Sequence, residues 1–187
     1  MSGSMRIALL AAGTLLLGGC ASTTSVRDLE DRPLDPLAVK DARAVVLVFT
    51  DSECPIANAY SPELRRLRDE FAPRGVRFFL VYADGSRTLV EVRAHVAAYA
   101  QPMEAVRDPE HELVRRAGAT RTPEACVFLP GGELVYRGRI DDRYVDFGKQ
   151  RAAPTTRDLR DALEAVLSGG TPAEPWGPAI GCTIPDR

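Results

Sequence analysis

Two strongly apolar runs constrain what this chain can fold into more than any other feature. They are Val45–Phe49 and Val76–Tyr82, and each is too short for a buried helix of ordinary length. A run without polar alternation is typical of a strand that is covered on both faces. Such cover requires helices above and below the sheet, so the runs predict an α/β domain with a buried central sheet.

The rest of the chain continues this alternation of strands and helices. Apolar residues recur at helical spacing from Tyr60 to Phe71, which predicts a helix from Pro55 to just before Pro73. We expect a helix capped by Ser86, then a strand over 104–107 and a helix over 111–117. A β-hairpin of 125–129 and 133–139 should follow, and then a last helix capped by Thr155 or Thr156. This order predicts a central mixed sheet with helices on both faces.

Length and charge limit the classes of function. The chain has 187 residues, of which 45% are hydrophobic and 27% charged, which suits one folded domain. The net charge of -2 gives no electrostatic basis for binding nucleic acid. We therefore expect a single globular domain without a nucleic-acid partner.

The amino terminus has the pattern of an export signal. Arg6 precedes a short apolar stretch, Ile7–Leu17, which is too short to span a bilayer. The stretch ends in Leu17–Cys20 (Leu-Gly-Gly-Cys), which resembles the lipobox of bacterial lipoproteins. This resemblance implies a signal peptide over 1–19 and a lipid on Cys20. The alternative is an ordinary secretory signal in which the cysteine has no role.

The lipobox implies a location and a domain organisation. We expect a lipoprotein of the cell envelope that faces the periplasm, with the membrane as a partner through Cys20. The residue after that cysteine is Ala21 and not Asp, which favours the outer membrane. Residues 20–40 are polar and are predicted to be the lipidated cysteine and a tether, 41–170 the domain, and 171–187 a flexible tail that carries Cys182.

The remaining cysteines point to redox chemistry rather than to metal binding. Three cysteines remain, Cys54, Cys126 and Cys182, so at most one intramolecular disulfide can form. A compartment outside the inner membrane permits disulfides. The chain has no Cys-x-x-Cys pair, and its only histidines are His95 and His111, so we expect neither a zinc site nor another cofactor.

Several motifs together resemble a known superfamily. The segment Val46–Pro55 is a buried strand that turns and offers Cys54 at a helix start, and Arg121–Pro123 contains Thr-Pro. Both resemble the thioredoxin signature. Three further motifs resemble a peroxiredoxin-like branch of redoxin-domain proteins: Cys54–Tyr60, Tyr136–Asp142 and Ala179–Cys182. The resemblance implies a thioredoxin-like fold in which the Thr122–Pro123 bond is cis and lies beside Cys54.

The position of Cys54 has a physical meaning that does not depend on the resemblance. A thiol at a helix start faces unpaired backbone N–H groups and the positive end of the helix dipole. Cysteines in such places have pKa values of about 3.5–7.5, against about 8.5 for a free thiol. Cys54 is therefore the predicted nucleophile, and the alternative is a buried structural cysteine.

The sequence departs from the familiar patterns at several positions. Ala57 stands where thioredoxin has its second cysteine, and Asp51 and Leu47 stand where peroxiredoxins have Thr and Pro. The predicted partner of Cys54 is Cys182 in the tail, which would form a disulfide with it on oxidation; the alternative is a tail cysteine without a role.

The other candidate residues have plainer interpretations beside the functional ones. Cys126 falls in a strand and is expected to be a core residue. Arg121 could polarise a peroxide, or it could simply be solvated. Asp141 and Asp142 are expected to be turn residues.

Three functions remain open at this stage. The first is a thiol–disulfide oxidoreductase that acts on periplasmic thiol or disulfide proteins. The second is a thiol peroxidase in which Cys54 attacks peroxide and Cys182 resolves the product; both would need an external reductant. The third is a non-catalytic binding or copper-delivery module, although Asn58 occupies the position of the second cysteine in a Cys-x-x-x-Cys copper motif.

Overall fold

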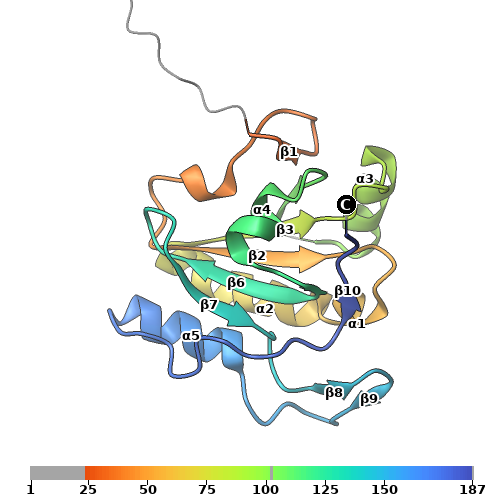
Figure 1. Ribbon diagram of the computed structural model, residues 1–187. Coiled ribbons are helices and arrows are strands. Elements are labelled where there is room, and N and C mark those ends of the chain that lie inside the picture. Colours follow the sequence, from red (N-terminus) through yellow and green to blue (C-terminus); the bar gives the residue numbers. More distant parts are fainter. Residues whose placement is uncertain (1–23, 102, 187) are drawn as a thin grey trace, which may run out of the picture.

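A computed structural model describes residues 24–101 and 103–186 of the chain (Figure 1). The predicted signal peptide over 1–19 and the predicted lipidation at Cys20 lie outside the described residues. Among the residues that are described, no helix is long and apolar enough to cross a membrane.

A six-stranded mixed sheet forms the centre of the domain, in the order β1-β4-β3-β2-β6-β7. Strands β2, β3 and β4 are parallel, whereas β1, β6 and β7 run antiparallel to their neighbours. The bounds of these strands are β1 Arg27–Asp28, β2 Ala44–Thr50, β3 Val76–Tyr82, β4 Glu104–Arg107, β6 Glu124–Phe128 and β7 Leu134–Gly138. The expected thioredoxin-like α/β fold with a mixed central sheet is confirmed.

The apolar run of β2 is explained by burial at every position of the strand. Because side chains alternate across a strand, Val46 and Val48 enter one core and Val45, Leu47 and Phe49 enter the other. Helices contribute to both cores, as the sequence predicts: α1, α2, α3 and α5 to the first, and α4 to the second. Their bounds are α1 Pro55–Ala59, α2 Ser61–Phe71, α3 Leu89–Ala98, α4 Glu112–Ala117 and α5 Asp158–Leu167.

The helix expected from Pro55 to Pro73 is divided in two. Helix α1 ends at Ala59, and α2 begins at Ser61 with Pro62 in its first turn. Proline has no N–H to donate to the carbonyl four residues earlier, and its ring crowds that carbonyl, so a continuous helix cannot run through Pro62. The break separates the short helix that begins at Cys54 from the longer helix that packs under the sheet.

Two helix starts also differ from expectation. Helix α3 is capped by Thr88 and not by Ser86, because Thr88 and Glu91 form a reciprocal capping box. Helix α5 begins at Asp158 without a side-chain cap, because its N-cap residue is Arg157. The hydroxyls of Thr155 and Thr156 donate to the carboxylates of Asp142 and Asp158 instead.

The segment expected to be a tether is packed onto the domain from Thr24 onward. Val26 is fully buried, and β1 pairs antiparallel with β4 at the edge of the sheet. Thr24 and Ser25 donate hydrogen bonds to the Glu112 carboxylate at the start of α4. This segment is packed and not a free tether because its apolar side chains, Val26 above all, pack into the second core.

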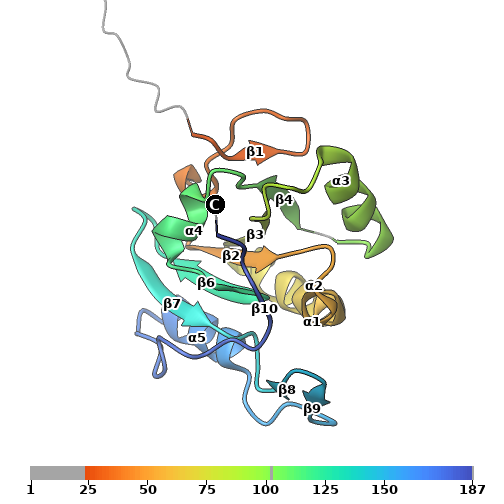
Figure 2. The ribbon, with the colours of Figure 1, turned by 45° about the vertical axis from the view of Figure 1, so that its right-hand side comes forward.

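The tail is ordered and crosses the domain rather than extending from it. A second short sheet joins β10 (Cys182–Thr183) to β5 (Arg121–Thr122). Earlier in the tail, before β10, two backbone hydrogen bonds join it to β7: the N–H of Arg137 donates to the carbonyl of Pro175, and the N–H of Gly177 donates to the carbonyl of Arg137. The guanidinium of Arg137 also lies over the Trp176 ring. The tail therefore covers the outer edge of β7 before it reaches β5 (Figures 1 and 2).

Candidate active site at the start of helix α1

Cys54 lies where the sequence predicts, at the turn between β2 and α1. It is the N-cap residue of α1, with Pro55 in the first turn, and it is only 1% exposed. Its thiol donates a hydrogen bond of 2.9 Å to the carbonyl of Thr122. The site is thus assembled from two distant segments, the β2–α1 turn and β5.

Thr122 and Pro123 form the second side of the site. The peptide bond between them is cis, which confirms the prediction from the Thr-Pro motif. In the β5–β10 pair, Thr122 is directly opposite Cys182. The pairing thus brings the predicted partner cysteine to the same backbone group that Cys54 contacts.

The two thiols influence each other's ionisation in opposite directions. Burial raises the pKa of Cys54, but hydrogen bonds from the Cys182 thiol and the Ala57 N–H outweigh burial, and the pKa is lowered below its usual value. Burial, the hydrogen bond to Cys54 and the charge on Cys54 together raise the pKa of Cys182 to about 11. At neutral pH, Cys54 is therefore the better nucleophile and Cys182 is the proton donor.

The side chain of Thr122 has an unusual environment. Thr122 is 3% exposed, and its hydroxyl Oγ1 has no hydrogen-bond partner while Cys54 is a thiol. Leaving a buried hydroxyl unpaired costs about 1–3 kcal/mol. The same side chain lowers the Cys54 pKa, because it can donate to the ionised sulfur. The hydroxyl is thus matched to the thiolate form of the site and not to the thiol form.

A cavity of about 280 Å³ opens in front of the two sulfurs. Its lining includes three carboxylates, from Asp51, Glu53 and Asp84, and the guanidinium of Arg87. Arg87 lies 2.7 Å from Glu53, 3.3 Å from Asp84 and 3.5 Å from Asp51. The ion pair with Arg87 lowers the pKa of Glu53. Three acids and one base give the entrance a net negative charge.

A chain of hydrogen bonds, partly or fully buried, supports the turn before Cys54. The amide of Asn58 in α1 donates to the carbonyl of Ser52 at 2.9 Å. Its oxygen is 2.8 Å from Nε2 of His95, whose Nδ1 is 2.7 Å from the hydroxyl of Tyr82. Burial lowers the pKa of His95, so the neutral ring is favoured. With Nε2 protonated, all of these groups are satisfied, and α1 is tied to β3 and α3.

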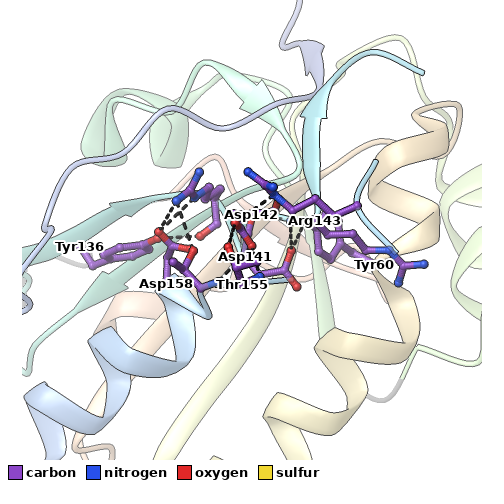
Figure 3. A network of polar contacts seen from close by, with 10 residues as sticks. Tyr60, Tyr136, Asp141, Asp142, Arg143, Thr155 and Asp158 are labelled. Atoms are coloured by element: carbon purple, nitrogen blue, oxygen red, sulfur yellow. Dashed lines mark hydrogen bonds and ion pairs between the residues drawn. The ribbon is translucent and has the colours of Figure 1, made fainter. Parts of the chain in front are cut away.

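Tyr60 and Asp141 anchor the other end of α1 (Figure 3). The Tyr60 hydroxyl donates to Oδ1 of Asp141 at 2.5 Å, and both residues are only 4% exposed. The same carboxylate oxygen accepts the backbone N–H of Arg143 at 2.9 Å. Burial, followed by the bond to Asp141, raises the pKa of Tyr60, so the phenol remains a donor well into the alkaline range.

Asp141 and Asp142 are buried hydrogen-bond acceptors, whereas the sequence predicts ordinary turn residues. Asp142 accepts the N–H groups of Thr155 and Thr156 at 2.6 and 3.0 Å and pairs with Arg151 at 3.1 Å. It closes the loop that contains the small hairpin of β8 (Tyr144–Asp146) and β9 (Lys149–Gln150). Two adjacent aspartates are common in exposed turns, so the sequence gives no local sign of their burial.

The remaining candidate residues, Cys126 and Arg121, do not line the cavity in front of Cys54 and Cys182. Cys126 is fully buried in the second core, on the opposite face of the sheet from the core that contains Cys54, and burial raises its pKa well above the usual value. Arg121 is exposed and donates to Thr183 at 2.8 Å, and it is not among the cavity-lining residues. Within the described part of the chain, no group of three His, Cys, Asp or Glu residues could hold a metal ion.

The comparison with known families decides the relationship of this chain. The model of the AhpC/TSA family matches residues 18–139, a stretch that contains β2, Cys54 and the Thr122–Pro123 bond. The chain belongs to the AhpC/TSA family. This is a redoxin family of the thioredoxin superfamily, which agrees with the resemblance found in the sequence. The match ends before the tail, so Cys182 and β10 are not covered by the family model.

Solved structures resemble this AhpC/TSA member over most of its length. An uncharacterized protein from Geobacillus kaustophilus is 24% identical with a TM-score of 0.74, and the match covers 87% of each chain. A hypothetical protein from Sinorhizobium meliloti 1021 is 27% identical with a TM-score of 0.73, covering 85% of this chain and 88% of the other.

A less similar solved structure is that of a redox protein. A secreted Mycobacterium tuberculosis disulfide oxidoreductase, homologous to DsbE of E. coli, is 17% identical with a TM-score of 0.52, covering 79% of this chain and 96% of the other. That level of identity shows a shared fold alone. No curated protein matches the chain in sequence.

Proposed function

We propose that the domain is a thiol–disulfide oxidoreductase in which Cys54 is the nucleophile and Cys182 is its partner. The observation that supports this most directly is the pair of neighbouring thiols with opposite pKa shifts, lowered at Cys54 and raised to about 11 at Cys182. A thiolate beside a thiol is the arrangement that disulfide exchange requires. Cys54 attacks, and Cys182 completes a disulfide with it.

The negative charge on the Cys54 sulfur determines the sequence of these two steps. Cys182 first donates a hydrogen bond to the Cys54 thiolate and stays protonated. When Cys54 forms a bond to the substrate, its negative charge disappears. That charge contributes to the raised pKa of Cys182, so the pKa of Cys182 falls after the first step. The second thiol therefore becomes a nucleophile only when it has an intermediate to attack. An external thiol reductant then restores both thiols.

A hydroperoxide is a second candidate for the oxidant. The observation that favours it is the burial of Cys54, which is 1% exposed behind a cavity of about 280 Å³. The thiolate attacks one peroxide oxygen, the O–O bond breaks, and the departing oxygen leaves as water or an alcohol after taking a proton. Cys54 becomes a sulfenic acid, and Cys182 displaces its oxygen as water to form the disulfide.

Mass mapping of tryptic peptides tests the cysteine pair. After one equivalent of hydrogen peroxide or of a small disulfide, the peptides that hold Cys54 and Cys182 should be linked. Cys182→Ser should instead accumulate sulfenic acid or a mixed disulfide at Cys54, and Cys54→Ser should give neither product. Cys126→Ser, in the opposite core, is the matched control and should behave as the unmodified protein. Unlinked peptides in the oxidised protein would refute the pairing.

We also propose that the protein is held at the periplasmic side of the cell envelope by a lipid on Cys20. The support is the sequence alone: the short apolar stretch Ile7–Leu17 and the lipobox-like Leu17–Cys20. Several acyl chains on one residue would give stable anchoring, whereas one chain would not. Cys20→Ser should abolish labelling by a radioactive fatty acid and release the protein into the soluble periplasm. A variant that stays with the membranes would contradict this anchor.

A further inference from the structure

The tail strand lies on the backbone that borders Cys54. Strand β10 pairs antiparallel with β5, with Cys182 opposite Thr122 and Thr183 opposite Arg121. The pairing continues one residue further, because the N–H of Ile184 donates to the carbonyl of Thr120 at 3.0 Å. Both ribbon views show the tail running past the start of α1 (Figures 1 and 2). The free edge of β5 is thus used by the chain itself.

Gly181 makes this close approach possible. A Cβ atom at Gly181 would lie 2.0 Å from the carbonyl oxygen of Thr122 and 2.6 Å from its carbonyl carbon. These contacts are with backbone, which cannot move aside as a flexible side chain can, so any other residue must push the tail away from β5. Gly177, four residues earlier, is different: a Cβ there would meet nothing within 4 Å.

The docked tail determines what can reach the sulfur. Residues Cys182–Pro185 form part of the lining of the cavity in front of Cys54. Hydrogen peroxide is not much larger than a water molecule, which occupies about 30 Å³ in the liquid, and it fits a cavity of about 280 Å³. An extended polypeptide would need the space and the β5 hydrogen bonds that the tail backbone already uses.

We propose that strand β10, held in place by Gly181, restricts Cys54 to small substrates and excludes polypeptide disulfides. The inference rests on the proposed function, because it concerns access to the Cys54 thiolate. A polypeptide disulfide is reduced only after β10 leaves β5. The thiolate then attacks one sulfur, the substrate S–S bond breaks, and the other sulfur leaves as a thiolate. Cys182 then displaces the first sulfur as a second thiolate, so the substrate gains two electrons and the protein becomes the disulfide.

Gly181→Ala is the variant that tests the exclusion, and Gly177→Ala is its matched control in the same tail. Ile184→Ala is a second test, because Ile184 is 5% exposed and its truncation loosens the tail without touching the backbone beside Cys54. Thermal unfolding checks that each variant is folded. Limited proteolysis within residues 171–187 reports whether the tail has been released.

Single-turnover rates of the reduced proteins are measured with two probes, hydrogen peroxide and insulin disulfides. The unmodified protein and Gly177→Ala should lose the Cys54 thiol readily to peroxide and react slowly with insulin. The single-turnover rate with insulin should be at least about tenfold higher for Gly181→Ala and Ile184→Ala than for the unmodified protein. A tenfold ratio corresponds to about 1.4 kcal/mol of lost docking free energy of the tail. Release of β10 also withdraws the Cys182 hydrogen bond that lowers the Cys54 pKa, so the rates of these variants with peroxide should be unchanged or lower, and their ratio of insulin rate to peroxide rate should rise.

The results separate this inference from the proposed function. If Cys54→Ser reacts with both probes as the unmodified protein does, the proposed function is wrong. If Cys54 is required but insulin reacts equally fast with the unmodified protein and both loosened variants, β10 does not exclude polypeptides. If Gly181→Ala leaves the tail as resistant to proteolysis as Gly177→Ala does, Gly181 does not hold the strand, and the inference is overturned at that step.

Discussion

Removing one hydroxyl, in Tyr60→Phe, should destabilise the domain measurably. The hydroxyl donates to the Asp141 carboxylate at 2.5 Å, and neither residue is more than 4% exposed. The substitution keeps the ring and its contact with Tyr144, whose centroid is 5.4 Å away. It therefore removes only the hydrogen bonding of one buried hydroxyl, which ties α1 to Asp141 in the loop after β7.

The expected magnitude follows from the charge and burial of the acceptor. A hydrogen bond to a charged group contributes about 1.5–3 kcal/mol. Water cannot replace the lost donor without rearrangement, because the carboxylate is buried and retains mainly the N–H of Arg143. For a protein of this size, 1 kcal/mol shifts the melting temperature by about 2–4 °C. Tyr60→Phe should thus lower the melting temperature by about 3–12 °C.

Thermal unfolding followed by circular dichroism measures the shift, with Tyr99→Phe as the control. Tyr99 is 38% exposed, so its hydroxyl has access to water in the folded protein. The control substitution should change the melting temperature little. Equal melting temperatures for Tyr60→Phe and Tyr99→Phe would refute the reasoning, because the bond to Asp141 would then add nothing to stability.

Three further outcomes follow from the ionisable and polar groups. Iodoacetamide near pH 7 should modify Cys54 before Cys182, whose pKa is about 11, and a peptide map that shows the reverse order would contradict the lowered Cys54 pKa. At a pH below the Cys54 pKa, where Cys54 is a thiol and the hydroxyl is unpaired, Thr122→Val should leave the free energy of unfolding unchanged or higher, and it should raise the Cys54 pKa, seen as an alkylation–pH profile moved to higher pH. The urea midpoint should begin to fall above about pH 8.5, the usual cysteine pKa, because Cys126 and Cys182 have raised pKa values in the folded protein, so that only the unfolded chain loses these protons there. Above about pH 10, the usual tyrosine pKa, the fall should become steeper for the same reason. The groups concerned are the buried tyrosines Tyr60, Tyr82 and Tyr136.

The parts of the fold that depend on short-range patterns could be predicted from the sequence. The apolar run of β2, the helix start at Cys54 and the Thr122–Pro123 bond all depend on residues that are close together in the chain. Cys54 and the bond before Pro123 lie where they are expected. The division between α1 and α2 has a local cause as well, since Pro62 is visible in the sequence.

The parts that sequence reasoning missed depend on contacts between distant residues. Strands β1, β5 and β10 have two residues each, which is too short for any periodic signal. The bond between Tyr60 and Asp141 joins residues 81 positions apart. The close approach of Gly181 to Thr122 likewise cannot be read from a glycine in a Pro- and Gly-rich tail, where glycine usually indicates flexibility.

The arrangement of the two ends of the described chain has a consequence for solubility. An open edge strand can pair with the same strand of a second molecule and begin an aggregate. Here β1 covers β4 at one edge of the sheet, and the tail around Trp176 covers β7 at the other. The segment that places Cys182 beside Cys54 therefore also shields the sheet from other copies of the protein. A truncation before Pro175 would uncover β7, and such a variant should self-associate as its concentration rises.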